Sequence, residues 1–126
     1  MHKSKLAGFI IDCQTTDLDG AADFWSRALG MPLRALPEEE RGIYRGLEDT
    51  RQGLEIEVQA VTHQSRVHLD IETDDIEAEV ARLEKLGAKR VQRVRTWWVM
   101  EAPTGQRFCV IRAASREFQV KAIQWP

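Results

Sequence analysis

Hydrophobic and polar positions follow two patterns along this chain, and both patterns occur once in each half. Apolar runs rich in β-forming residues predict strands, and apolar positions three or four residues apart predict helices. The predicted order in each half is one strand, one helix and then three strands. The expected strands are Leu6–Cys13, Met31–Leu36, Gly42–Leu47, Leu54–Val61, Arg66–Glu72, Lys89–Val94, Trp97–Met100 and Phe108–Arg112.

The two predicted helices begin and end with the same signals. An acidic residue precedes each helix and is expected to accept hydrogen bonds from its free N–H groups. The capping residue is Asp17 or Asp19 in the first helix and Asp74 or Asp75 in the second. A glycine, Gly30 or Gly87, supplies the left-handed stop. The apolar positions of the first helix, at helical spacing, include Leu18, Ala21, Ala22, Trp25 and Leu29, and the buried stripe of the second is Ile76, Val80, Leu83 and Leu86.

The helix segments are copies of one plan. Thr16–Gly30 and Asp74–Ala88 each open with an acid followed by an aliphatic residue, and each stops at Leu-Gly. Asp17 and Asp75 are 58 residues apart, a period too long for most solenoid repeats. The sequence therefore predicts an α+β fold of two tandem βαβββ modules, related by a pseudo-twofold axis, with a cleft between them.

Composition is typical of one globular domain. The chain has 126 residues, of which 43% are hydrophobic and 30% charged, as in ordinary soluble proteins. We expect a single domain, 1–126, with module one at about 6–61, module two at about 66–112 and a tail at 113–126. The apolar residues of the tail are expected to dock it on the body or on a partner chain; they are Phe118, Val120, Ile123 and Trp125.

Net charge and the absence of targeting signals in the sequence indicate which classes of partner and which compartment to expect. A net charge of −2 argues against nucleic acid, which favours a basic face. No apolar run approaches the roughly 18 residues that span a bilayer, and the first residues lack the features of a secretory signal. Cys13 and Cys109 match no zinc or redox spacing. We expect a reduced, cytoplasmic protein with no nucleic-acid or membrane partner.

Three segments in this order and spacing resemble the vicinal oxygen chelate superfamily of glyoxalases, bleomycin-resistance proteins and extradiol dioxygenases. They are Asp17–Met31, Arg66–Ala88 and Glu101–Ile111, and the chain is most similar to the glyoxalase-like domains. The resemblance covers about 6–112 and implies a curved mixed sheet around a central cup. Because this fold hosts isomerases, lyases, dioxygenases and proteins that only bind drugs, activity must be argued from the site.

The resemblance also implies where metal ligands would stand. Metal-dependent members carry one ligand near the start of each module's first strand and one on each module's last strand. His68 fits the first-strand position of module two, and the repeat pairs it with Ile10, which cannot bind a metal. The last strand of module one offers Glu57 or Gln59, and that of module two offers Cys109.

Cys109 lies in an apolar run, Phe108–Ile111, and is expected to be an inert core cysteine, because apolar burial raises a thiol pKa. His68 and Glu57 alone would be too few ligands for a catalytic metal ion, because catalytic zinc usually has three protein ligands. The sequence thus favours a bleomycin-resistance type of protein without a complete metal site. Its cup would bind a small aromatic or amphipathic compound through Gln59, His68 and either Trp97 or Trp98.

Two alternatives stay open. One is a metal-dependent lyase, isomerase or dioxygenase in which His68 and Glu57 hold a weakly bound divalent ion of zinc, nickel, iron or manganese. The other is an interaction module with a vestigial cup. The resemblance also implies a homodimer, because paired modules from two chains can complete a cup in single-domain members.

Overall fold

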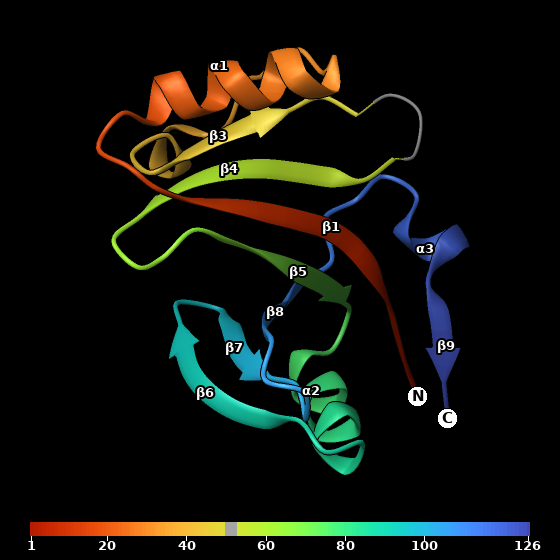
Figure 1. The fold of residues 1–126 in the computed structure, drawn as a ribbon. Coiled ribbons are helices and arrows are strands. Elements are labelled where there is room, and N and C mark those ends of the chain that lie inside the picture. Colours follow the sequence, from red (N-terminus) through yellow and green to blue (C-terminus); the bar gives the residue numbers. More distant parts are fainter. Residues whose placement is uncertain (50–52) are drawn as a thin grey trace. The chain divides into compact units, whose positions relative to one another are not determined.

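The computed structural model describes residues 1–49 and 53–126, and it confirms the α+β class and the two βαβββ modules (Figure 1). Module one contains β1 (His2–Gln14), α1 (Leu18–Leu29), β2 (Leu33–Arg34), β3 (Tyr44–Leu47) and β4 (Glu55–Val61). Module two contains β5 (Arg66–Thr73), α2 (Ile76–Lys85), β6 (Lys89–Val94), β7 (Trp97–Glu101) and β8 (Arg107–Arg112). A 3-10 helix η1 (Glu38–Glu40), helix α3 (Phe118–Lys121) and strand β9 (Ile123–Trp125) complete the assigned elements.

The chain divides into two compact units, which are Gly8–Val67 and the combination of Met1–Ala7 with His68–Pro126. Strand order is β2-β3-β4-β1 in the first unit, and β5-β8-β7-β6 follows the same plan in the second. In each module the first and last strands are parallel, and the other pairs are antiparallel. The two modules therefore share one topology, as the sequence repeat predicts.

In the Gly8–Val67 unit, α1 lies over β3 and β4 (Figure 1). The helix is capped by Asp17, whose Oδ1 accepts a hydrogen bond from the Gly20 N–H at 3.0 Å. Gly30 ends the helix with a φ of 67°, in the left-handed region that glycine tolerates best. Beneath the helix the buried core consists of Ile11, Leu47, Ile56 and Val58.

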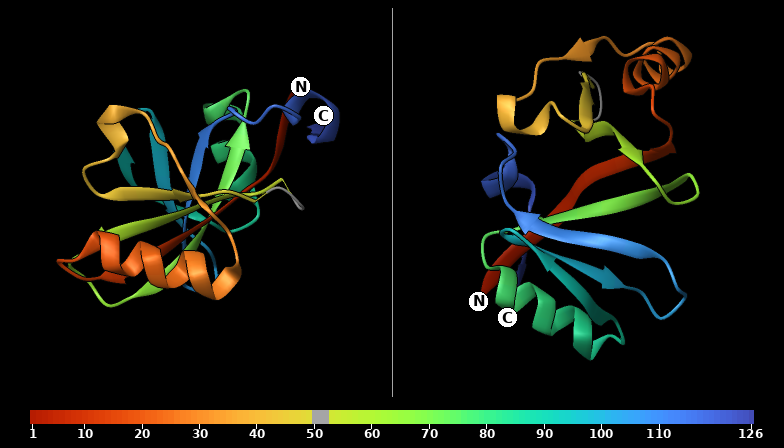
Figure 2. Two further views of the ribbon diagram at one scale, coloured as in Figure 1. Left: turned by 90° about the horizontal axis from the view of Figure 1, so that it is seen from above. Right: turned by 90° about the vertical axis from the view of Figure 1, so that its left-hand side faces the viewer.

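In the second unit, α2 packs against β6, β7 and β8 (Figure 2). Its cap is Asp75, which accepts a hydrogen bond from the Ala78 N–H at 3.0 Å. The core is formed by Val80, Leu83, Met100 and Val110, with Ile71, Ile76, Ala88, Trp98 and Phe108 packed around it. Alternation along Arg66–Glu72 predicts that the helices cover Val67, Leu69 and Ile71. This prediction is wrong for Val67 and Leu69, whose side chains are 58% and 50% exposed. Only Ile71 of that strand face reaches the core.

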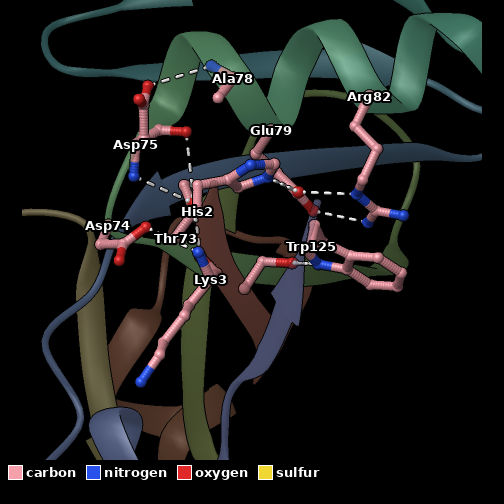
Figure 3. Close-up of polar contacts among 10 residues, drawn as sticks. His2, Lys3, Thr73, Asp74, Asp75, Ala78, Glu79, Arg82 and Trp125 are labelled. Carbon is pink, nitrogen blue, oxygen red and sulfur yellow. Dashed lines mark hydrogen bonds and ion pairs between the residues drawn. The ribbon is translucent and has the colours of Figure 1, made fainter.

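The tail docks on the body of the second unit, which makes β1 longer than predicted. Strand β9 pairs with the first residues of β1, Trp125 lying opposite His2, and Phe118 is almost fully buried. The Trp125 indole N–H donates to Ser4 Oγ at 2.8 Å. The guanidinium of Arg82 lies 3.8 Å from the centre of the Trp125 ring (Figure 3), a stabilising cation–π geometry.

Glu79 of α2 is fully buried and contacts residues of β1 and α2. Its carboxylate is 2.8 Å from His2 Nε2, and it accepts hydrogen bonds from Arg82 Nε at 2.9 Å and Nη2 at 2.8 Å (Figure 3). Burial raises the pKa of Glu79, but hydrogen bonds from Arg82, His2 and Ser4 outweigh it, so the pKa lies below its ordinary value. The ionised carboxylate therefore links β1, α2 and, through Arg82, the tail.

Among the described residues, no helix is both long enough and apolar enough to cross a bilayer.

Candidate functional site

The face of the second unit's sheet that is turned away from α2 gathers polar side chains. Ile71, Val110 and Trp98 pack on the α2 side, so their neighbours along β5, β8 and β7 point to the other side. The pairing register arranges these neighbours in three rows across the strands. The rows are His68, Arg107 and Glu101; Asp70, Cys109 and Val99; and Glu72, Ile111 and Trp97.

Three side chains of this face form a set of metal-ligand type. One ligand atom each of His68, Asp70 and Cys109 lies within 4.8 Å of the other two, and His68 Nε2 is 3.7 Å from Asp70 Oδ1. The side chains of His68 and Asp70 are largely buried, with exposures of 14% and 16%. Ligand atoms around tetrahedral zinc, at bond lengths of about 2.0–2.3 Å, lie roughly 3.3–3.7 Å apart. Small side-chain adjustments would therefore close the set around an ion.

The chemistry of the set suits zinc, which accepts imidazole nitrogen, carboxylate oxygen and thiolate sulfur. Cys109 differs from the expected core cysteine, because it shares a face with His68 and Asp70 rather than with the core residues Val110 and Phe108. Alternation along Arg66–Glu72 predicts Asp70 on the same polar face as His68 and Glu72, but the sequence alone gives it no ligand role. The pairing register of β5 and β8, which the sequence does not reveal, places Cys109 directly opposite Asp70.

The rows on either side of Asp70 and Cys109 differ in exposure. In one row, Arg107 Nε donates to Glu101 Oε1 at 3.1 Å, and the two side chains are 39% and 36% exposed. In the other row, Glu72 is buried. Its carboxylate accepts from Ser115 Oγ at 2.7 Å and lies 3.8 Å from Lys5 Nζ. Asp70 and Cys109 thus lie between the half-exposed Arg107–Glu101 ion pair and the buried Glu72 carboxylate, which is hydrogen-bonded to Ser115.

The two adjacent tryptophans take different roles. Trp98 packs against the core beneath α2, and the guanidinium of Arg90 lies 5.0 Å from its ring centre. Trp97 is half-buried and shares the face of His68 by strand alternation. Of the two tryptophans named from sequence, Trp97 is the one on the polar face.

The remaining predicted site residues lie in the Gly8–Val67 unit, whereas the ligand set lies in the other. Glu57 is half-buried, and its Oε2 is 3.6 Å from Arg34 Nη2. Gln59 donates from Nε2 to the Tyr44 hydroxyl at 3.2 Å. Ile10 is buried in the core, with 5% exposure, as its apolar side chain requires.

Comparisons with known proteins agree with this architecture. The family model of the glyoxalase-like domain matches residues 8–111. No curated protein matches the chain. Methylmalonyl-CoA epimerase from Mycobacterium tuberculosis is similar with a TM-score of 0.64 at 18% identity, covering 86% of this chain and 88% of that one.

Two further solved structures show the same likeness. A hypothetical protein from Bacillus halodurans has a TM-score of 0.58 and 15% identity, covering 90% of this chain and 98% of its own. A variant of Streptomyces coelicolor methylmalonyl-CoA epimerase, in complex with 2-nitronate-propionyl-CoA, has a TM-score of 0.56 and 19% identity, with coverages of 87% and 98%. Identities this low establish the fold but not the activity. With the family model spanning both modules, the chain belongs to the glyoxalase-like domain family and has the vicinal oxygen chelate fold.

Proposed function

We propose that this protein binds a small molecule on the polar face of module two, with a divalent metal ion held by His68, Asp70 and Cys109. The observation that carries the proposal is the grouping of their three ligand atoms within 4.8 Å. This donor set favours a bound metal over the metal-free site that the comparison of the two repeats suggested. Zinc suits it best, because nitrogen, oxygen and sulfur donors are all zinc ligands.

Three protein ligands would leave a coordination position for a ligand oxygen, as in catalytic rather than structural zinc sites. A bound ion would supply Lewis acidity toward that oxygen. Trp97 and Val99 offer apolar surface beside the set, which suits the aromatic or amphipathic ligand predicted from sequence. The ligand-binding roles of Gln59 and Glu57 stay predictions from the sequence.

Metal analysis tests this function directly. Protein purified without chelator is expected to contain about one zinc or other divalent ion per chain. After chelation, zinc at about 100 times its Kd should raise the free energy of unfolding by about 2.7 kcal/mol. Less than about 0.1 metal per chain, with no gain in melting temperature from zinc, nickel, iron or manganese, would contradict the proposal.

A second candidate function is a metal-dependent isomerase acting next to a carbonyl group. It is favoured by the coordination position that a metal held by three protein ligands would leave open, and by structural neighbours that are named methylmalonyl-CoA epimerases. Epimerisation requires that the carbon beside the thioester carbonyl loses a proton and regains one. Polarisation of that carbonyl lowers the cost of the carbanionic intermediate.

Hydrogen exchange tests this activity. Zinc-loaded protein incubated with methylmalonyl-CoA in D2O is expected to introduce deuterium at the carbon beside the thioester carbonyl, as read by mass spectrometry. The His68→Ala variant should lose the exchange, whereas His63→Ala, at an exposed loop histidine, should retain it. Exchange no faster than in a protein-free control would rule out this activity for methylmalonyl-CoA and leave the binding function standing.

A further inference from the structure

Arg107 stands beside the proposed metal site and is only partly used within the protein. Pairing of Leu69 with Phe108 sets Arg107 next to His68 on the neighbouring strand, where strands are about 4.8 Å apart. Its Nε bonds to Glu101 at 3.1 Å. Within residues 1–49 and 53–126, no acceptor contacts its terminal nitrogens. The Arg107 side chain as a whole is 39% exposed.

A guanidinium anchored in this way is suited to bind a carboxylate. Its planar fork presents parallel N–H donors that match the two oxygens of a carboxylate, and the bond from Nε to Glu101 restricts its orientation. Such bidentate, charge-assisted contacts combine strength with directional selectivity. Glu101 occupies only Nε, so the two terminal nitrogens of the guanidinium remain for the ligand.

We propose that Arg107 binds the carboxylate of the ligand, while a second oxygen of the same molecule approaches His68, Asp70 and Cys109. This inference rests on the proposed function of that face. Arg107 and Cys109 are two residues apart on β8, a separation of about 6.6 Å along a strand. The ligand class is a carboxylic acid that also carries a hydroxyl or carbonyl oxygen, as mandelate does.

Mandelate and its neutral methyl ester provide the test, because they differ only in the charged group. Zinc-loaded wild-type protein is expected to bind mandelate at least about 10-fold more tightly than the ester by calorimetry. Arg107→Gln should weaken mandelate binding by about 10-fold or more and change ester binding by less than about 2-fold. Arg107→Lys should give an intermediate loss, because lysine keeps the charge but lacks the fork.

Two further variants separate this role from a general charge effect. Glu101→Gln removes the negative charge that competes for Arg107 but keeps an amide oxygen that can accept from Nε, so mandelate binding is expected to tighten several-fold. Arg93→Gln removes the same charge from the opposite side of the sheet, since Arg93 is paired with core-facing Trp98. It should leave both affinities unchanged. Melting temperatures near the wild-type value would show that the variants fold.

Equal weakening of acid and ester in Arg107→Gln, or no weakening of either, would overturn the assignment. Failure of wild-type protein to bind mandelate, or tighter binding of phenyl phosphate than of mandelate, would also overturn it. Metal content, measured in the same samples, separates this inference from the proposed function. Metal-loaded protein with no preference for the acid contradicts only the role of Arg107, whereas protein that takes up no metal contradicts the proposed function. The acid–ester contrast is also measured on metal-free protein, so the arginine is tested in either case.

Discussion

Replacing Glu79 with alanine is expected to lower the free energy of unfolding by about 3–5 kcal/mol, the range for breaking a buried charge network by removing one partner. Glu79 is fully buried and accepts hydrogen bonds from His2 and from two nitrogens of Arg82. Without the carboxylate, these donors lose their acceptor, and Arg82 loses the group that holds it over Trp125. Urea denaturation followed by tryptophan fluorescence measures the change.

Glu77 provides the matched control on the same helix. Its side chain is 66% exposed and paired with Arg90 at 3.1 Å, so Glu77→Ala should cost at most about 1 kcal/mol. Similar losses in the two variants would show that the Glu79 network does not stabilise the fold as we infer.

The pH dependence of the Glu79→Ala effect has a defined sign. The pKa of Glu79 is lower in the folded state than its ordinary value, so the carboxylate stabilises the fold above about pH 4.3, the usual pKa of an unfolded glutamate. That contribution is lost as pH falls through the lower folded-state pKa. The difference between wild type and variant should therefore be largest above about pH 5 and become smaller below about pH 4.

The fold was readable from sequence because its signals are local. Acidic caps and glycine stops are set by a few neighbouring residues, and the observed caps are Asp17 and Asp75, one from each predicted pair. Two copies of the same signals then identified the modules. The role of Glu79 was not readable, because a helix acid close to Arg82 normally indicates a solvent-exposed ion pair. Its burial depends on His2 and Trp125, which are distant in sequence.

Only part of the candidate site could be predicted from the sequence, because the rest depends on pairing between strands that are distant in sequence. Alternation in β5 placed His68 and Asp70 on one face, but the apolar run around Cys109 has no alternation of its own. Strand pairing decides which face it presents, and pairing is a long-range property. The repeat identifies Ile10 as a position without a metal-binding side chain, and this stays a prediction about the site. It pairs Asp70 with Asp12, each five residues before its helix cap, so an aspartate shared by both copies suggested no ligand role.

Cys109→Ser is expected to weaken zinc binding by at least about 100-fold, because even outer-shell partners of a metal site contribute about 10- to 100-fold and a thiolate contributes directly. The variant retains a small side chain at a half-buried position, so the fold should persist. Cobalt replaces zinc as a visible probe, and a thiolate ligand adds charge-transfer absorption that serine cannot provide. Absorption titration with cobalt therefore measures both affinity and sulfur coordination.

Cys13→Ser is the matched control, because Cys13 lies in the other unit and its sulfur is directed toward the Ile11 carbonyl at 3.6 Å. It should keep wild-type affinity and the charge-transfer band. Asp70→Asn should bind zinc less tightly yet retain the band, since its thiolate is intact, whereas His68→Ala should lose affinity as strongly as Cys109→Ser. A charge-transfer band that survives in Cys109→Ser but disappears in Cys13→Ser would show that the metal binds in the Gly8–Val67 unit instead. Weaker zinc binding in every variant except the Cys13 control would instead establish that three residues from two strands of one module suffice to hold the ion.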